Sequence, residues 1–282
     1  MKWTKVLCFS LLIIVLGGFF TPVMGYDLAV TEPSELKGNI SNWVILDARP
    51  KSEWQKGHIP GAESFSWENY TRTDENNIRY RIWPPKKLSV ALGNMGIHEK
   101  SPVVVYGDAD ESWGGEGWAC WVLLWIGHQG PVRLLNGGIQ AWKRYGFPLT
   151  KIANQRIGSQ VSYTIRIRPE VRATASQIRK QGAAMRIVDT RSTLEWLVGR
   201  IPGSVHITWK DFFSGKERRP INAAEMKMRL KSHRIDTDSS IVYYCTGGIR
   251  SAYVWLVHQL SGLPLARNFE GGMEAWKRTG TR

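Results

Sequence analysis

The sequence predicts an α/β protein made of two similar domains in tandem, each a mainly parallel sheet with helices on both faces. Strand-like apolar runs alternate with helical patterns along the chain, which is typical of parallel sheets. The chain also contains one unit twice. The block Asp47–Gly61 recurs as Asp189–Gly203 at an offset of 142, and Gly137–Trp142 recurs as Gly271–Trp276 at an offset of 134. With 282 residues, the chain has room for two ordinary domains.

The second half shows the order of elements most clearly. β-branched and aromatic runs predict strands, and apolar residues at helical spacing predict helices. In chain order, we expect a strand at 186–189, a helical turn at 192–197, a short strand at 204–208, a helix at 223–231, a strand at 241–244, a helix at 251–260, an extended segment at 265–270 and a helix at 273–276. Sites in such sheets lie at the carboxyl ends of the strands.

A cysteine stands at that end. Cys245 follows the buried strand 241–244 directly, and the next residues lead through two glycines to an arginine and a helix. Backbone N–H groups at a strand–loop–helix junction form an anion site and favour thiolate over thiol. The planar fork of an arginine can hold an oxyanion. We therefore expect a nucleophilic sulfur that handles an anionic substrate, with a loop made of Thr246, Gly247, Gly248, Ile249 and Arg250.

The first residues resemble an export signal rather than part of the fold. Residues 1–5 are basic, residues 6–20 are apolar, and a small residue precedes a possible cleavage site between Gly25 and Tyr26. We expect an exported protein, periplasmic in location, with residues 1–25 removed and no stable membrane association afterwards. An uncleaved anchor is the alternative. Cleavage removes Lys2 and Lys5 and no acid, which lowers the formal charge from +14 to +12.

Composition narrows the partners further. A basic surface raises the local concentration of anions, but no K/R-rich run or nucleic-acid motif is present, so we expect no nucleic-acid partner. The six histidines are scattered without ligand spacing, and we expect no metal site and no cofactor. Cys120 lies in an apolar helical stretch and is expected in the core, although a redox pair with Cys245 is a second hypothesis. Trp113 and Trp209 are candidates for a domain cleft.

The repeated blocks and the cysteine loop resemble those of the tandem rhodanese-domain sulfurtransferases, the thiosulfate and mercaptopyruvate sulfurtransferases. The resemblance spans essentially the whole mature chain. It implies a rhodanese-like domain at 27–150, a linker at 151–162 and a catalytic rhodanese-like domain at 163–282. The first domain has Gly107 where the second has Cys245, and its acidic loop Asp108–Glu111 is longer and lacks an arginine. The first domain is therefore expected to be inactive.

The resemblance also implies the chemistry. Cys245 would take a sulfane sulfur as a persulfide and pass it to a thiol, cyanide or a protein acceptor, with N–H groups from Thr246 to Arg250 around the sulfur. Arg250 would orient the donor's anionic end. Arg191 is a further substrate-binding candidate, with an ion pair to Asp189 or Glu195 as the alternative. The C-x4-R spacing suits a single sulfur atom better than a phosphoryl group, and Arg250 favours thiosulfate or another inorganic anion as donor. A persulfide or selenium/tellurium carrier with little turnover is the alternative function.

Overall fold

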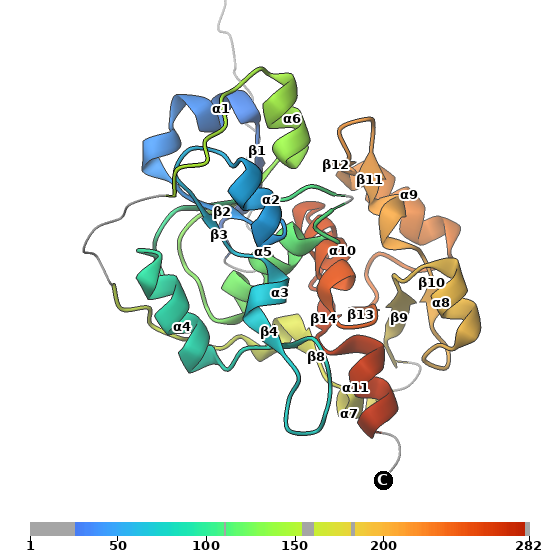
Figure 1. The fold of residues 1–282 in the computed structure, drawn as a ribbon. Helices are drawn as coiled ribbons and strands as arrows, with labels where there is room; N and C mark the ends of the chain where they lie inside the picture. Colours follow the sequence, from blue (N-terminus) through green and yellow to red (C-terminus); the bar gives the residue numbers. More distant parts are fainter. Residues whose placement is uncertain (1–25, 110, 154–160, 182–183, 280–282) are drawn as a thin grey trace, which may run out of the picture.

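The computed structural model describes residues 26–109, 111–153, 161–181 and 184–279. Each half forms one five-stranded sheet in which every ladder is parallel, with strand orders β1-β7-β6-β2-β3 and β10-β9-β13-β14-β8. Helices flank both sheets (Figure 1). The predicted fold class is therefore confirmed. The predicted signal 1–25 and most of the predicted linker 151–162 lie outside the described residues.

In the N-terminal half the middle strand of the sheet is β6, and Gly107, the residue that corresponds to Cys245, follows it directly. The strands are β1 Leu28–Thr31, β2 Val44–Asp47, β3 Ala62–Ser64, β6 Val103–Tyr106 and β7 Val132–Leu135, with a hairpin of β4 Thr71–Arg72 and β5 Arg81–Ile82. The helices are α1 Pro33–Gly38, α2 Lys51–Lys56, α3 Trp67–Tyr70, α4 Pro85–Asn94, α5 Gly115–Trp125 and α6 Gly138–Arg144, with a 3-10 turn at Ile40–Asn42.

The C-terminal half repeats this plan. Its strands are β8 Arg172–Ala173, β9 Arg186–Asp189, β10 Val205–His206, β13 Ile241–Tyr244 and β14 Arg267–Phe269, with a hairpin of β11 Phe213–Ser214 and β12 Arg219–Pro220. Its helices are α7 Ala175–Gln181, α8 Thr193–Val198, α9 Ala223–Ser232, α10 Ile249–Leu260 and α11 Gly272–Thr279, with 3-10 turns at Pro169–Val171 and Trp209–Phe212. Every element expected in this half occurs, but α10 begins two residues before the expected helix and so includes Arg250.

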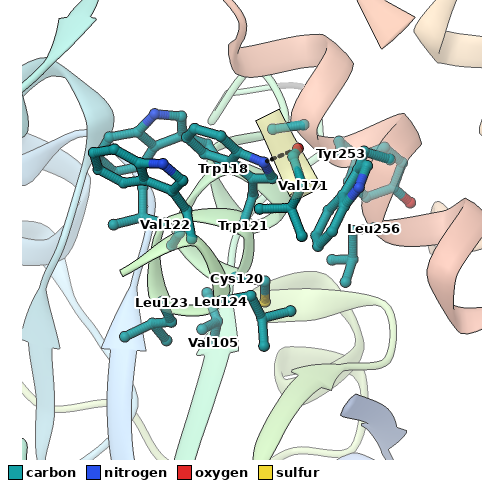
Figure 2. Close-up of a cluster of buried hydrophobic side chains, with 14 of the residues drawn as sticks. Val105, Trp118, Cys120, Trp121, Val122, Leu123, Leu124, Val171, Tyr253 and Leu256 are labelled. Atoms are coloured by element: carbon teal, nitrogen blue, oxygen red, sulfur yellow. Dashed lines mark hydrogen bonds between the residues drawn. The ribbon is translucent and has the colours of Figure 1, made fainter. Parts of the chain in front are cut away.

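The two halves share one core. Helices α5 and α10 pack against each other between the sheets, as Figure 1 shows. A single buried apolar cluster includes side chains of both helices, and Figure 2 shows Trp118 and Trp121 of α5 near Tyr253 and Leu256 of α10. Trp121 Nε1 donates a hydrogen bond to the carbonyl of Val171, 3.1 Å away. The tryptophans of α5 are therefore core residues.

Each half also extends its hairpin to the other half. Arg81 of β5 forms an ion pair with Glu270 at 2.7 Å, and the N–H of Ile82 donates to the same carboxylate at 2.9 Å. In return, Arg219 of β12 lies 3.3 Å from Glu32 of the first half. Each domain thus covers part of the other. Among the described residues, no helix is both long and apolar enough to span a membrane.

Candidate active site

The sulfur of Cys245 lies at the carboxyl end of the central strand β13. The side chain is only 1% exposed, and a short loop separates it from α10. Gly248 precedes the helix with a φ of 98°, which favours glycine because other side chains are strained there. Its N–H donates to Cys245 Sγ at 3.1 Å. The sulfur thus faces the positive end of a 12-residue helix, which favours a bound negative charge.

The carbonyl groups of this loop are held by β14 and by the segment that follows it. The carbonyls of residues 245–248 accept hydrogen bonds from the N–H groups of Met273, Glu274 and Gly271 and from the side chain of Asn268, at 2.9 to 3.1 Å. Because these carbonyls are bonded to neighbouring elements, the loop N–H groups are free to turn toward the sulfur. The repeated glycine block thus shapes the cradle that the sequence predicts around Cys245.

Arg250 does not present a bare cation. Its Nη1 and Nη2 atoms each lie 2.8 Å from one oxygen of Glu195, and Nη2 also donates to Thr246 Oγ1 at 2.8 Å. The Thr246 hydroxyl donates in turn to Glu195 at 2.6 Å. Burial lowers the pKa of Arg250, but hydrogen bonding to Glu195 and the charge of Cys245 outweigh it and raise the pKa. The cation is therefore paired with Glu195 at the start of α10.

Glu195 is the site residue that the sequence prediction missed. It matches in the repeated Asp–Arg–Glu block, but it was considered only as a partner of Arg191. Burial alone would raise the pKa of Glu195. Hydrogen bonds from Arg250, Thr246 and Ser192 together outweigh burial and hold the pKa well below its usual range. Glu195 is therefore ionised at any pH at which the protein would be assayed.

The Arg191 side chain binds two residues of its own repeated block, Asp189–Gly203. Its Nη2 lies 2.6 Å from Asp189 and donates to the carbonyl of Gly199, also at 2.6 Å. In the first domain Arg49 makes the same ion pair with Asp47 at 2.6 Å. Since the same pair occurs in the first domain, whose loop has Gly107 in place of a cysteine, it holds the turn after the strand in both domains.

Two aromatic residues of the first domain lie against the cysteine loop. The ring centre of Trp113 is 5.6 Å from the Arg250 guanidinium carbon, and the ring is 53% exposed. A Cβ on Gly247 would lie 2.5 Å from Tyr80. Trp113 and Tyr80 both have left-handed backbones, with φ of 53° and 63°, and such strain is common near functional sites. Trp209 is instead buried and packs against Tyr253.

The corresponding place in the first domain is filled by a carboxyl group. Gly107 follows β6 as Cys245 follows β13, and a Cβ there would lie 2.2 Å from Glu116 Oε2. Glu116 is the second residue of α5, as Arg250 is of α10, so the two domains have an acidic and a basic side chain, respectively, at this position. Burial raises the pKa of Glu116 to about 7, against the lowering effect of hydrogen bonds from its own N–H and from Ser112. The offset of 134 in the sequence would have revealed this match.

Cys120 is not part of this site. Cys120 and Cys245 are both free thiols, which argues against the disulfide hypothesis. Cys120 is fully buried in α5, and burial raises its pKa, so its thiol is unreactive at neutral pH. Among the described residues, no group of His, Cys, Asp and Glu side chains is placed to hold a metal ion.

Comparison with known proteins agrees with this geometry. Residues 32–145 and 172–279 both match the rhodanese-like domain family. A thiosulfate sulfurtransferase of Azotobacter vinelandii is 26% identical over 88% of this chain and 93% of its own length. The sulfur carrier protein TtuD of Thermus thermophilus is 28% identical over 79% of this chain and 83% of its own. The 3-mercaptopyruvate sulfurtransferase SseA of Escherichia coli has the same fold, with a TM-score of 0.75 at 20% identity over 86% of this chain and 97% of that one. The chain belongs to the rhodanese family, as a tandem-domain sulfurtransferase of the thiosulfate and 3-mercaptopyruvate sulfurtransferase kind.

Proposed function

We propose that this sulfurtransferase takes a sulfane sulfur from an anionic donor onto Cys245 and passes it from the persulfide to a thiophilic acceptor. The observation that carries the proposal is the position of Cys245 Sγ, which accepts the Gly248 N–H bond at the N-terminal end of α10, beside Arg250. Thiosulfate is the donor that we expect, because a relative of this chain is named for that donor.

The two half-reactions balance without a cofactor. The Cys245 thiolate attacks the outer sulfur of thiosulfate, the S–S bond of the donor breaks, and sulfite leaves with the electron pair. The persulfide anion that remains is stabilised by the loop N–H groups and by Arg250. A nucleophile such as cyanide or a thiolate then attacks the outer sulfur and releases the Cys245 thiolate.

A carrier role is the second candidate. The relative named as a sulfur carrier protein supports it, since its loop could hold a persulfide for delivery to a partner protein with little turnover. A selenium or tellurium carrier would use the same thiol. Steady-state turnover with small acceptors separates an enzyme from a carrier: a carrier becomes loaded once and stops.

We also propose that the protein is exported, with residues 1–25 as a cleaved signal and the periplasm as its location. The support is the basic, then apolar, then small-residue pattern of that segment. N-terminal sequencing of the protein from the expressing cell would give Tyr26 if the proposal holds, and Met1 if the segment is retained.

The decisive experiment follows the sulfur on intact protein. We expect Cys245→Ser to abolish thiosulfate–cyanide turnover and to lose the sulfur atom that cyanide removes from the wild-type protein, because a hydroxyl is a much weaker nucleophile than a thiolate. Mass spectrometry before and after cyanide measures the transferred sulfur. The matched control is Cys120→Ser, which should keep both turnover and loaded sulfur. Retained transfer in Cys245→Ser would refute the assignment.

A further inference from the structure

The contact between Glu195 and Arg250 is unusual for a site that receives an anion. Both Nη atoms of Arg250, the ones best placed to hold an oxyanion, are already bonded to one carboxylate at 2.8 Å. Arg250 is only 8% exposed, so little of its guanidinium is accessible to a second anion. A donor anion that approaches the sulfur therefore meets a neutralised ion pair rather than a free cation.

Glu195 is held firmly in this place. It is the third residue of α8, where the N–H and hydroxyl of Ser192 donate to Oε2 at 3.1 and 2.8 Å. Thr246 donates to Oε1 at 2.6 Å. The carboxylate is thus bonded from its own helix and from the cysteine loop, so a donor oxyanion cannot displace it without breaking both sets of bonds.

The fold does not require this arrangement. In the first domain, the repeat places Glu53 at the matching position of α2, and Glu53 instead pairs with Lys56 at 2.5 Å on the surface. There it faces no cysteine loop cation, since Glu116 takes the place of Arg250 in that domain. The carboxylate at the loop is therefore a feature of the catalytic domain's chemistry rather than of the shared fold.

We propose that Glu195 is a built-in counter-anion of Arg250 and determines donor specificity by charge. It leaves Arg250 in place beside the sulfur but cancels its attraction for the donor, so donors with less negative charge are favoured over dianions. Because Coulomb energy is proportional to the product of the charges, a dianion is penalised twice as much as a monoanion. The inference rests on the proposed function and refines it: thiosulfate is accepted, and a monoanionic sulfane donor such as an alkyl thiosulfonate suits the site better.

The test uses a reaction of Cys245 that does not depend on sulfur transfer. In full-length protein carrying Cys8→Ser and Cys120→Ser, iodoacetate and iodoacetamide alkylate the same Cys245 thiolate and release iodide, and they differ by one negative charge. Glu195→Gln removes the charge with little change of shape. We expect it to raise the ratio of the iodoacetate rate to the iodoacetamide rate about fivefold to tenfold. Glu53→Gln in the first domain is the matched control and should leave the ratio unchanged.

Donor kinetics supply the second readout. Glu195→Gln should raise kcat/KM for both donors, thiosulfate being a dianion and methanethiosulfonate a monoanion. Because the electrostatic energy doubles with the charge, the fold-increase for thiosulfate should be about the square of the fold-increase for methanethiosulfonate. Glu195→Asp, which keeps the charge, should behave more like the wild type than like Glu195→Gln. If Glu195 merely positions Arg250, both alkylation rates fall together and their ratio stays constant, which overturns the inference. If the wild type alkylates normally but takes no sulfur from either donor, the proposed function fails instead.

Discussion

The charge on the second residue of the helix after the loop is the main difference between the two domains. Arg250 extends beside a sulfur, whereas Glu116 folds back to within 2.2 Å of where a Cβ on Gly107 would stand. The carboxyl thus fills the space that a cysteine side chain would need. The predicted inactivity of the first domain therefore rests on two differences together, the missing thiol and the inserted carboxyl group.

The buried Glu116 makes stability depend on pH. Its pKa is raised by burial from 4.5 to about 7, so the charged form is disfavoured in the folded state. The loss of folding stability caused by this buried carboxyl is absent below about pH 4.5, grows as the pH rises toward 7, and is complete above pH 7. At 1.36 kcal/mol per pKa unit, the loss reaches about 3 kcal/mol. Glu116→Gln, neutral throughout, should therefore gain about 2–3 kcal/mol of unfolding free energy over the wild type between pH 5 and pH 8. Urea unfolding at the two pH values measures this gain. An equal difference at both would contradict the buried charge.

At this scale the sequence predicted the nucleophile but not its electrostatic partners. Cys245 and the glycines are visible because a strand, a thiol and a turn are contiguous in the chain. The partner of Arg250 is 55 residues away at Glu195, and only the fold brings α8 beside the loop. For Arg191 the sequence left two interpretations open, substrate binding and a local ion pair. The structure contains the ion pair with Asp189, two residues away.

Among the elements, the start of α11 does the most to shape the site. Its glycine block was recognised in the sequence as a repeat and a family landmark, but its task became visible only in three dimensions. The N–H of Met273 bonds the carbonyl of Cys245 at 2.9 Å, and the N–H of Gly271 bonds that of Gly247 at 3.1 Å. Helix α10 likewise begins earlier than its apolar pattern suggests, because Ile249 and Arg250 are needed for its first turn.

A glycine substitution tests this shaping role. A Cβ at Gly272 would lie 2.2 Å from the carbonyl oxygen of Cys245, and the backbone there has a φ of +48°. Gly272→Ala should therefore push the loop away from α11 and reduce sulfur transfer by more than tenfold. Left-handed backbone alone costs an alanine about 1–2 kcal/mol, so Gly203→Ala is the control, with a φ of +76° and no atom within 4 Å of its Cβ. Thiosulfate–cyanide turnover of the two variants gives the comparison. Equal activities would mean that strain, and not the contact with Cys245, governs this position.

At the scale of the whole molecule, the two domains pack against each other through a shared hydrophobic core. The sequence indicated their similarity through the repeat. It could not show that α5 and α10 pack face to face, or that each hairpin reaches the other domain, because those contacts join residues more than 100 positions apart. The first domain thus supplies Tyr80 and Trp113 to the surroundings of the cysteine loop.

This shared core predicts that the catalytic half cannot work alone. Residues 160–282 expressed without the first domain would expose the α10 face that α5 covers, including Tyr253 and Leu256, and exposed apolar patches of this kind promote association. Glu270 would also lose Arg81, its partner at 2.7 Å, beside the segment that holds the loop carbonyls. We expect this fragment to be poorly soluble or much less active than the mature chain. Sulfur released by cyanide per chain, measured on the soluble fraction, gives the result, and co-expression of residues 26–159 should restore part of it. A soluble fragment with full activity would show that the interface between the domains is dispensable for the site.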